Sequence, residues 1–262
     1  MDIVFSHETA LQICAQLKMC GNEDVLLQRT TKNFRATYSA CSDEVYEEKL
    51  RFLKKEYGIV LPKTTHNILR DNSRTRFSET RVSHQFKCLL PAGSLIDLGQ
   101  NVYCVAPPLA VCLLSRNKSP LHQIVLANLM MASYGHLSNG DLCEFNTPLV
   151  SAEELASLLN ALESYSPGLH VTQKNMRFFF SDAASPMEVK MAIRSALPYC
   201  EGGFNQMPIA LNKSYVIKDQ INPELQAKER RLDLLFGKMS KSNLSGLNLV
   251  AIEYNGAYHD DF

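Results

Sequence analysis

Two apolar segments near the end of the chain each contain one acidic residue, and this pattern limits what the region can fold into. Residues 231–236 read Arg-Leu-Asp-Leu-Leu-Phe, with the acid at Asp233, and residues 249–256 read Leu-Val-Ala-Ile-Glu-Tyr-Asn-Gly, with the acid at Glu253. Short apolar runs of this kind predict buried β-strands. A carboxylate on a buried strand is unfavourable unless another group compensates its charge, and two on neighbouring strands repel each other. A hard divalent cation, which prefers oxygen ligands, resolves that conflict.

We therefore interpret Asp233 and Glu253 as candidate ligands of magnesium or manganese. A magnesium ion held in this way can generate a hydroxide nucleophile and stabilise the charge of a phosphodiester transition state. Glu188 ends the sequence Ser-Pro-Met-Glu at the start of a predicted helix, and it is a third candidate, as a metal ligand or as the holder of a metal-bound water. His259 follows the second apolar segment and completes the candidate catalytic group.

Each of these residues also has a structural interpretation. Glu188 can complete a capping box at the start of its helix. Asp233 can pair with Arg231, or it can be a strand-edge charge that discourages aggregation. Glu253 can be a surface residue that precedes a turn, and His259 can be an exposed residue near the chain end. The combination favours a metal site more strongly than any single residue does.

The rest of the chain predicts two regions, because 262 residues suit two cores better than one. We predict an α+β region over residues 1–166 and an α/β region over residues 167–262, with the boundary at Pro167-Gly168. Periodicity and capping signals predict helices after Ser6, Ser42, Pro107 and Ser151 and over residues 121–132, and strands over 82–90 and 102–105. The polar and basic stretch after Pro62 is interpreted mostly as loop.

Charge and composition restrict the function classes. Lysine and arginine total 27, and so do aspartate and glutamate, which excludes a bulk DNA-coating protein because that role needs a large positive field. A neutral total charge is still compatible with a local basic surface that binds DNA. Arg70, Arg74, Arg76 and Arg81 belong to a basic stretch that forms either a solvated loop or a set of phosphate contacts, and Arg231 is a further candidate DNA contact.

The eight cysteines stand among apolar neighbours without metal-binding spacing, which predicts free thiols in a reducing compartment. No apolar run approaches the roughly 18 residues that suggest a membrane span, and the first residues do not read as a signal peptide. We expect a cytoplasmic protein with no membrane partner.

The order of several short motifs resembles a known family. Ser185-Pro186-Met187-Glu188 is followed by Leu197-Pro198, Gly202-Gly203, Pro208, Asn212, Arg231-x-Asp233 and Glu253-x-x-Gly256-x-x-His259. This order resembles the very-short-patch-repair-like endonucleases of the PD-(D/E)XK superfamily, and in particular bacterial proteins in which that domain follows an AbiEi-antitoxin-like region. The resemblance covers residues from about 80 onward, and its motifs are most specific after residue 185.

The resemblance implies a restriction-endonuclease-like mixed sheet with flanking helices over residues 167–262. It implies that acids bind magnesium beside a DNA phosphate. On this chain Asp233 and Glu253 match the acids of the sheet, Glu188 matches the acid of the helix, and His259 matches the histidine after the glycine.

Two departures from the family pattern bear on activity. The position two beyond the last acid is Asn255, where the superfamily often has lysine and this subgroup has aspartate; its amide can bind a water but supplies no positive charge. Lys238 and Lys241 are candidate substitutes. The chain also ends at Phe262, before the basic helix and strand of the family, so we expect a domain truncated at its C-terminal end.

Three hypotheses follow from these patterns. The first is a magnesium-dependent DNA endonuclease, or a nuclease-derived domain without activity. The second is a non-catalytic DNA-binding regulator of the antitoxin type. The third is an interaction module that forms a homodimer through an open sheet edge.

Overall fold

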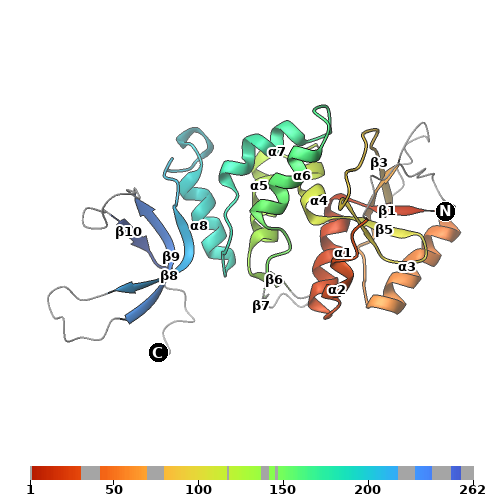
Figure 1. Ribbon diagram of the computed structural model, residues 1–262, viewed down its shortest axis with the longest axis horizontal. Coiled ribbons are helices and arrows are strands. Elements are labelled where there is room, and N and C mark those ends of the chain that lie inside the picture. The colour runs from red at the N-terminus through yellow and green to blue at the C-terminus, as the bar shows by residue number, and fades with distance from the viewer. Residues whose placement is uncertain are drawn as a thin grey trace.

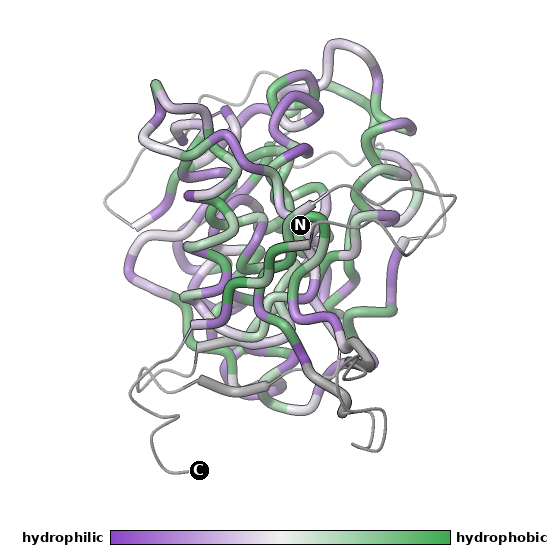
Figure 2. The backbone as a smooth tube through the Cα atoms, turned by 90° about the vertical axis from the view of Figure 1, so that its left-hand side faces the viewer, coloured by the Kyte–Doolittle hydropathy of each residue, from purple (hydrophilic) through white to green (hydrophobic). Residues whose placement is uncertain are grey.

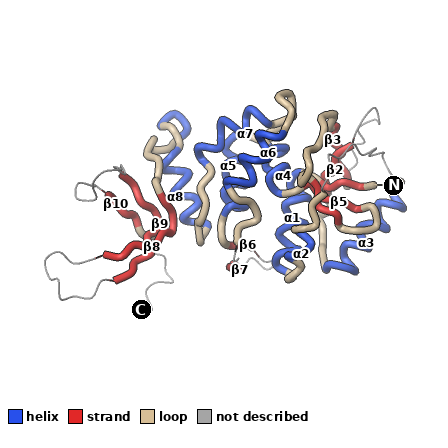
Figure 3. The backbone as a smooth tube through the Cα atoms, viewed as in Figure 1, coloured by secondary structure: helices blue, strands red, loops and turns tan. Residues whose placement is uncertain are grey.

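The computed structural model describes residues 2–30, 42–69, 80–116, 118–136, 142–144, 147–217, 228–237 and 249–254. The chain is mixed α/β. Its larger sheet lies at one end of an elongated molecule, a three-stranded sheet lies at the other end, and a layer of helices separates them (Figures 1 and 3).

The larger sheet has five strands in the order β3-β2-β1-β5-β4. The strands are β1 (Ile3–Phe5), β2 (Thr65–Leu69), β3 (Arg81–Gln85), β4 (Leu95–Asp97) and β5 (Val102–Val105). The sheet is mixed, because β1 runs parallel to β5 and antiparallel to β2, while β2 and β3 are parallel and β4 and β5 are antiparallel.

Helices α1 (His7–Met19) and α4 (Pro107–Leu114) follow directly after β1 and β5, and the described residues before residue 180 form six further helical elements. These are α2 (Glu23–Leu26), α3 (Asp43–Tyr57), α5 (Pro120–Met131), α6 (Ala152–Ala161), α7 (Leu169–Asn175) and the 3-10 helix η1 (Met176–Phe178). Both ends of α3 are capped: the side chain of Ser42, at the predicted start of the helix, accepts a bond from the Val45 N–H, and Gly58 ends the helix in the left-handed region at φ 69°.

The main hydrophobic core lies between this sheet and helices α1, α3, α4 and α6. Phe5, Ile13, Leu53 and Leu109 are among its fully buried side chains. Figure 2 shows hydrophobic stretches of the chain, in green, running through the middle of the molecule. Burial of this size stabilises the fold by roughly 25 cal/mol for each Å² of apolar surface removed from water.

The stretch after Pro62 was predicted to be mostly loop, and that prediction is wrong for the five residues of β2, which begins at Thr65. The strand was not predicted because its inward side chains are partly polar: Thr65 and Asn67 are buried, and Asn67 accepts a hydrogen bond from the Ser83 hydroxyl at 3.1 Å. Pairing with β1 and β3 on either side stabilises β2. The next predicted strand is also shorter than expected, since β3 ends at Gln85.

The second sheet is antiparallel, with the order β10-β9-β8. The elements of this end are α8 (Pro186–Ala196), the 3-10 helix η2 (Tyr199–Glu201), β8 (Ala210–Ile217), β9 (Lys228–Gly237) and β10 (Leu249–Ile252), and a short hairpin pairs β6 (Tyr134–His136) with β7 (Leu142–Glu144). Val189 and Ile193 of α8 pack with Leu211 and Leu234 of the sheet in a second core.

Helix α5 joins the two cores. Its Ile124 belongs to the second core, while the amide of its Gln123 donates to the Thr172 hydroxyl of α7 at 2.7 Å and accepts from Asn175 at 2.8 Å. The packing therefore places α7 against α4 and α5, so residues on both sides of Pro167-Gly168 share contacts.

Six cysteines of the described ranges are free thiols: Cys14, Cys20, Cys88, Cys104, Cys112 and Cys200. In the part of the chain that the structure describes, no helix combines the length and the apolar character that crossing a bilayer requires.

Candidate functional site

The register of β9 and β10 sets the two acids of the apolar segments at opposed positions. The register pairs Val250 with Phe236 and Ile252 with Leu234, and one further step places Glu253, directly after β10, opposite Asp233 of β9. Opposed residues of an antiparallel pair point to the same side of the sheet. Asp233 is half-buried, Glu253 is exposed, and the Oδ2 atom of Asp233 accepts a hydrogen bond from the Tyr254 N–H at 2.6 Å.

Glu188 lies in the first turn of α8, and its side chain is buried with 7% of the residue exposed. The Ser185 hydroxyl caps the helix by accepting from the Glu188 N–H at 3.2 Å. The Glu188 carboxylate accepts from the Ser185 hydroxyl at 2.9 Å and from the Ala184 N–H at 2.8 Å. In a full capping box it would instead accept from the Ser185 N–H, so the predicted box is only half formed and the carboxylate reaches one residue further back.

Asn212 of β8 links Glu188 to the sheet. Its Nδ2 atom donates to Oε2 of Glu188 at 2.6 Å, and its backbone oxygen accepts from Nε of Arg231 at 3.2 Å. The β8–β9 ladder pairs residues on either side of Asn212, so this residue lies across from Asp233. Asn212 has φ 51°, a left-handed conformation that asparagine tolerates better than most residues.

The surroundings of Glu188 oppose its ionisation. Burial raises the pKa of this carboxyl above its usual value, and the Asp233 carboxylate adds to that effect, while the hydrogen bonds from Ala184 and Ser185 and the charge of Arg231 lower the pKa. Burial, with a smaller contribution from the Glu188 charge, also raises the pKa of the Tyr134 hydroxyl. The charges of Asp233 and Arg231 therefore both act on the Glu188 carboxyl, in opposite directions.

Two carboxylates, those of Asp233 and Glu253, are available to a divalent cation at these opposed positions. Magnesium typically keeps several waters and takes only one or two carboxylates from a protein. Asp233 and Glu253 supply two, whereas both oxygens of Glu188 already accept hydrogen bonds. Within the described residues no group of three or more histidine, cysteine or acidic side chains could hold a metal ion. This arrangement favours Glu188 as a group that orients the site.

The two candidate DNA contacts that the structure describes lie on different sheets, Arg81 on β3 and Arg231 on β9. The Arg81 guanidinium donates to Asp43 at 2.9 Å and lies 4.7 Å from the centre of the Tyr46 ring, so it is part of the packing between β3 and α3. Arg231 is exposed on β9. The remaining predicted site residues lie outside the described ranges: Arg70, Arg74, Arg76, Asn255 and His259, with Lys238 and Lys241.

A second polar cluster was not predicted from the sequence. His7 at the start of α1 stacks on His84 of β3 with 3.9 Å between ring centres, and Nε2 of His84 lies 2.9 Å from Nδ1 of His66 on β2. The Glu8 carboxylate lies 3.9 Å from His66 and pairs with Lys118 at 2.6 Å. The three histidines are far apart in sequence, so only the pairing of β1, β2 and β3 brings them together.

No protein family, curated protein or solved structure matches this chain in the three comparisons with known proteins.

Replacement of Asn212 by alanine is expected to destabilise the fold by about 1–3 kcal/mol, because the buried Glu188 carboxylate loses a donor. Asn212→Gly removes the same amide but accepts φ 51°, so we expect it to be about 1 kcal/mol more stable than the alanine variant. Urea unfolding followed by circular dichroism measures both. Equal stability of the two variants would contradict the left-handed conformation.

Proposed function

We propose that this chain is a hydrolase of DNA phosphodiester bonds that depends on magnesium or manganese, or a domain derived from such a nuclease. The single observation that supports this proposal is the register that sets Glu253 opposite Asp233 on adjacent strands. The restriction-endonuclease-like arrangement of the second sheet and α8 belongs to the same proposal.

The residues have separate roles in this account. Asp233 and Glu253 hold the cation, which when bound supplies a nucleophilic hydroxide and neutralises phosphate charge. Arg231 lies two residues before Asp233 on β9 and therefore on the same side of the strand, where its guanidinium can contact a phosphate. Glu188 and Asn212 fix the position of α8 relative to the strands through their 2.6 Å hydrogen bond.

The alternative of a non-catalytic DNA-binding regulator depends mainly on Arg70, Arg74 and Arg76, outside the described residues. The hydrogen bond of Arg81 to Asp43 and its cation–π contact with Tyr46 give that alternative no support.

Conversion of supercoiled plasmid to nicked or linear DNA tests the proposal. We expect conversion with magnesium or manganese, no conversion in EDTA, and a loss of at least roughly 100-fold in rate for Asp233→Asn, because the metal loses a charged ligand. Glu201→Gln, a change to an exposed acid of η2, is the matched control and should cleave as the wild type does. Cleavage by Asp233→Asn at the wild-type rate would refute the assignment.

A further inference from the structure

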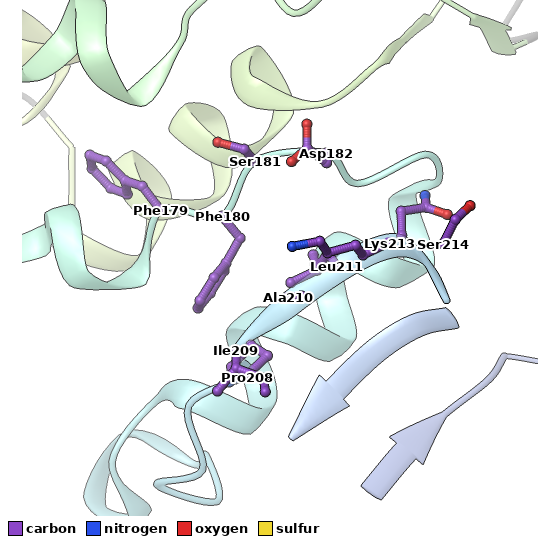
Figure 4. A pocket seen from close by; sticks show the side chains of 11 residues that line it. Phe179, Phe180, Ser181, Asp182, Pro208, Ile209, Ala210, Leu211, Lys213 and Ser214 are labelled. Carbon is purple, nitrogen blue, oxygen red and sulfur yellow. The ribbon is translucent and has the colours of Figure 1, made fainter. Parts of the chain in front are cut away.

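A slot runs along the outer edge of β8, beside the candidate metal site. It has a volume of about 530 Å³, and its walls are the segments Phe179–Asp182 and Pro208–Ser214 (Figure 4). Seven consecutive residues form the second wall, so side chains from both faces of β8 line the slot and it opens onto the edge of the strand. Among the described strands β8 has no partner on that side.

The opposite wall is fixed to α5. The side chain of the buried Asn128 donates to the Phe178 carbonyl and accepts from the Phe180 N–H, both at 2.8 Å. The Ser133 N–H donates to the Ala183 carbonyl at 3.0 Å, at the other end of the same segment. Because these bonds hold the segment at both ends, the slot is preformed, as is usual for sites that bind small ligands.

The lining combines groups that suit a nucleotide. The Lys213 side chain extends from β8 into the slot, and Phe180 lines the opposite wall (Figure 4). Ser181, Asp182 and Asn212 add hydroxyl, carboxylate and amide groups that can bond a base edge. The volume falls in the range of roughly 300–1,000 Å³ typical of small-molecule sites, so it suits one nucleotide and excludes a double helix.

Asn212 belongs both to the slot and to the surroundings of the candidate metal site. It lines the slot, and it also bonds Glu188 and the Arg231 side chain beside Asp233. A strand whose phosphate lies at Asp233 and Arg231 can therefore place an adjacent nucleotide in the slot.

We propose that this slot binds one unpaired nucleotide of a nucleic-acid strand, with the Lys213 ammonium on a phosphate and the polar groups of the 181–182 segment on the base. The inference rests on the proposed function, because it assigns the slot to the strand whose phosphodiester is cleaved. It predicts a preference for single-stranded or locally unpaired substrates over intact duplex.

Fluorescence anisotropy of a labelled oligo(dT), alone or annealed to oligo(dA), tests the inference in EDTA, where no cleavage interferes. We expect the single strand to bind more tightly than the duplex. For Lys213→Ala we expect weaker binding and a salt dependence reduced by about 0.7 in log–log slope, the value of one phosphate contact on a single strand. Ser214→Trp fills the slot from an exposed position and should also weaken binding, whereas Lys174→Ala, an exposed change on α7, should not.

The inference is overturned if Lys213→Ala and Ser214→Trp both bind the single strand as tightly as the wild type does. It is also overturned if the wild type binds the duplex more tightly than the single strand. Circular dichroism confirms that the variants fold. The Asp233→Asn, Glu253→Gln double variant separates the two proposals, because it should retain strand binding in EDTA. If the wild type binds the strand through the slot but does not nick plasmid DNA, only the proposed function is contradicted. If the wild type nicks plasmid DNA but its strand binding does not depend on the slot, only this inference is contradicted.

Discussion

Unfolding at about pH 5 is expected to require roughly 2–4 kcal/mol less free energy than unfolding at about pH 7, because the stacked histidines His7, His66 and His84 are neutral in the folded protein. Burial lowers the pKa of His7 from 6.5 to about 2 and that of His84 to about 4, and the neighbouring histidines and Arg116 add to the decrease. The pKa of His66 is also lowered by burial, against the opposing charge of Glu8.

The decrease in stability toward low pH follows from the difference in proton binding between the unfolded and folded states. Below pH 6.5 the histidines of the unfolded chain bind protons, while His84 in the folded state does so only near pH 4 and His7 only near pH 2. The unfolded state therefore gains protons first, and stability that is complete above pH 6.5 decreases as the pH falls, by at most about 1.4 kcal/mol per pH unit for each histidine. Glu8, whose pKa is lowered from 4.5, contributes only at lower pH.

Urea unfolding at several pH values measures this effect. His84→Gln removes one of the histidines that make stability depend on pH. We therefore expect the loss of unfolding free energy between pH 6 and pH 5 to be smaller than in the wild type by about 1.4 kcal/mol. The control is His122→Gln, which changes an exposed residue of α5 and should leave the wild-type slope. Identical slopes in all three proteins would show that the stack does not form.

Magnesium is expected to stabilise the wild type and to have no effect on the Asp233→Asn, Glu253→Gln double variant. A ligand that binds only the folded state stabilises it by about 2.7 kcal/mol at 100 times its dissociation constant. In EDTA the double variant should be at least as stable as the wild type, because two carboxylates on opposed strand positions no longer repel each other.

Thermal unfolding with and without magnesium checks this prediction, with Glu201→Gln as the control for the loss of a surface charge. The wild-type increase should persist in the control. An equal increase in the double variant would mean that magnesium binds elsewhere on the protein.

Elements with local signals could be predicted from the sequence. Ser42 and Gly58 mark the ends of α3, and Ser151, the predicted start of α6, forms a capping box with Glu154. These signals depend on residues three or four apart, so the sequence contains them in full. The strand at Asp233 was predictable because its neighbours are apolar.

Elements that depend on distant pairing could not be predicted in the same way. Strands β1 and β2 have few residues, and pairing across the sheet stabilises them more than their own composition does. The bond between Asn212 and Glu188 joins residues 24 positions apart. Its sequence signal is only an asparagine beside an apolar strand, which does not identify a partner. The histidine stack is non-local for the same reason.

The central claim is that Asp233 and Glu253 form one metal site, and calorimetric titration of magnesium and manganese tests it most directly. The account predicts saturable binding to the wild type and to Glu201→Gln, and no detectable binding to the Asp233→Ala, Glu253→Ala double variant. Binding of equal affinity in the double variant, or no binding to the wild type, would contradict the account.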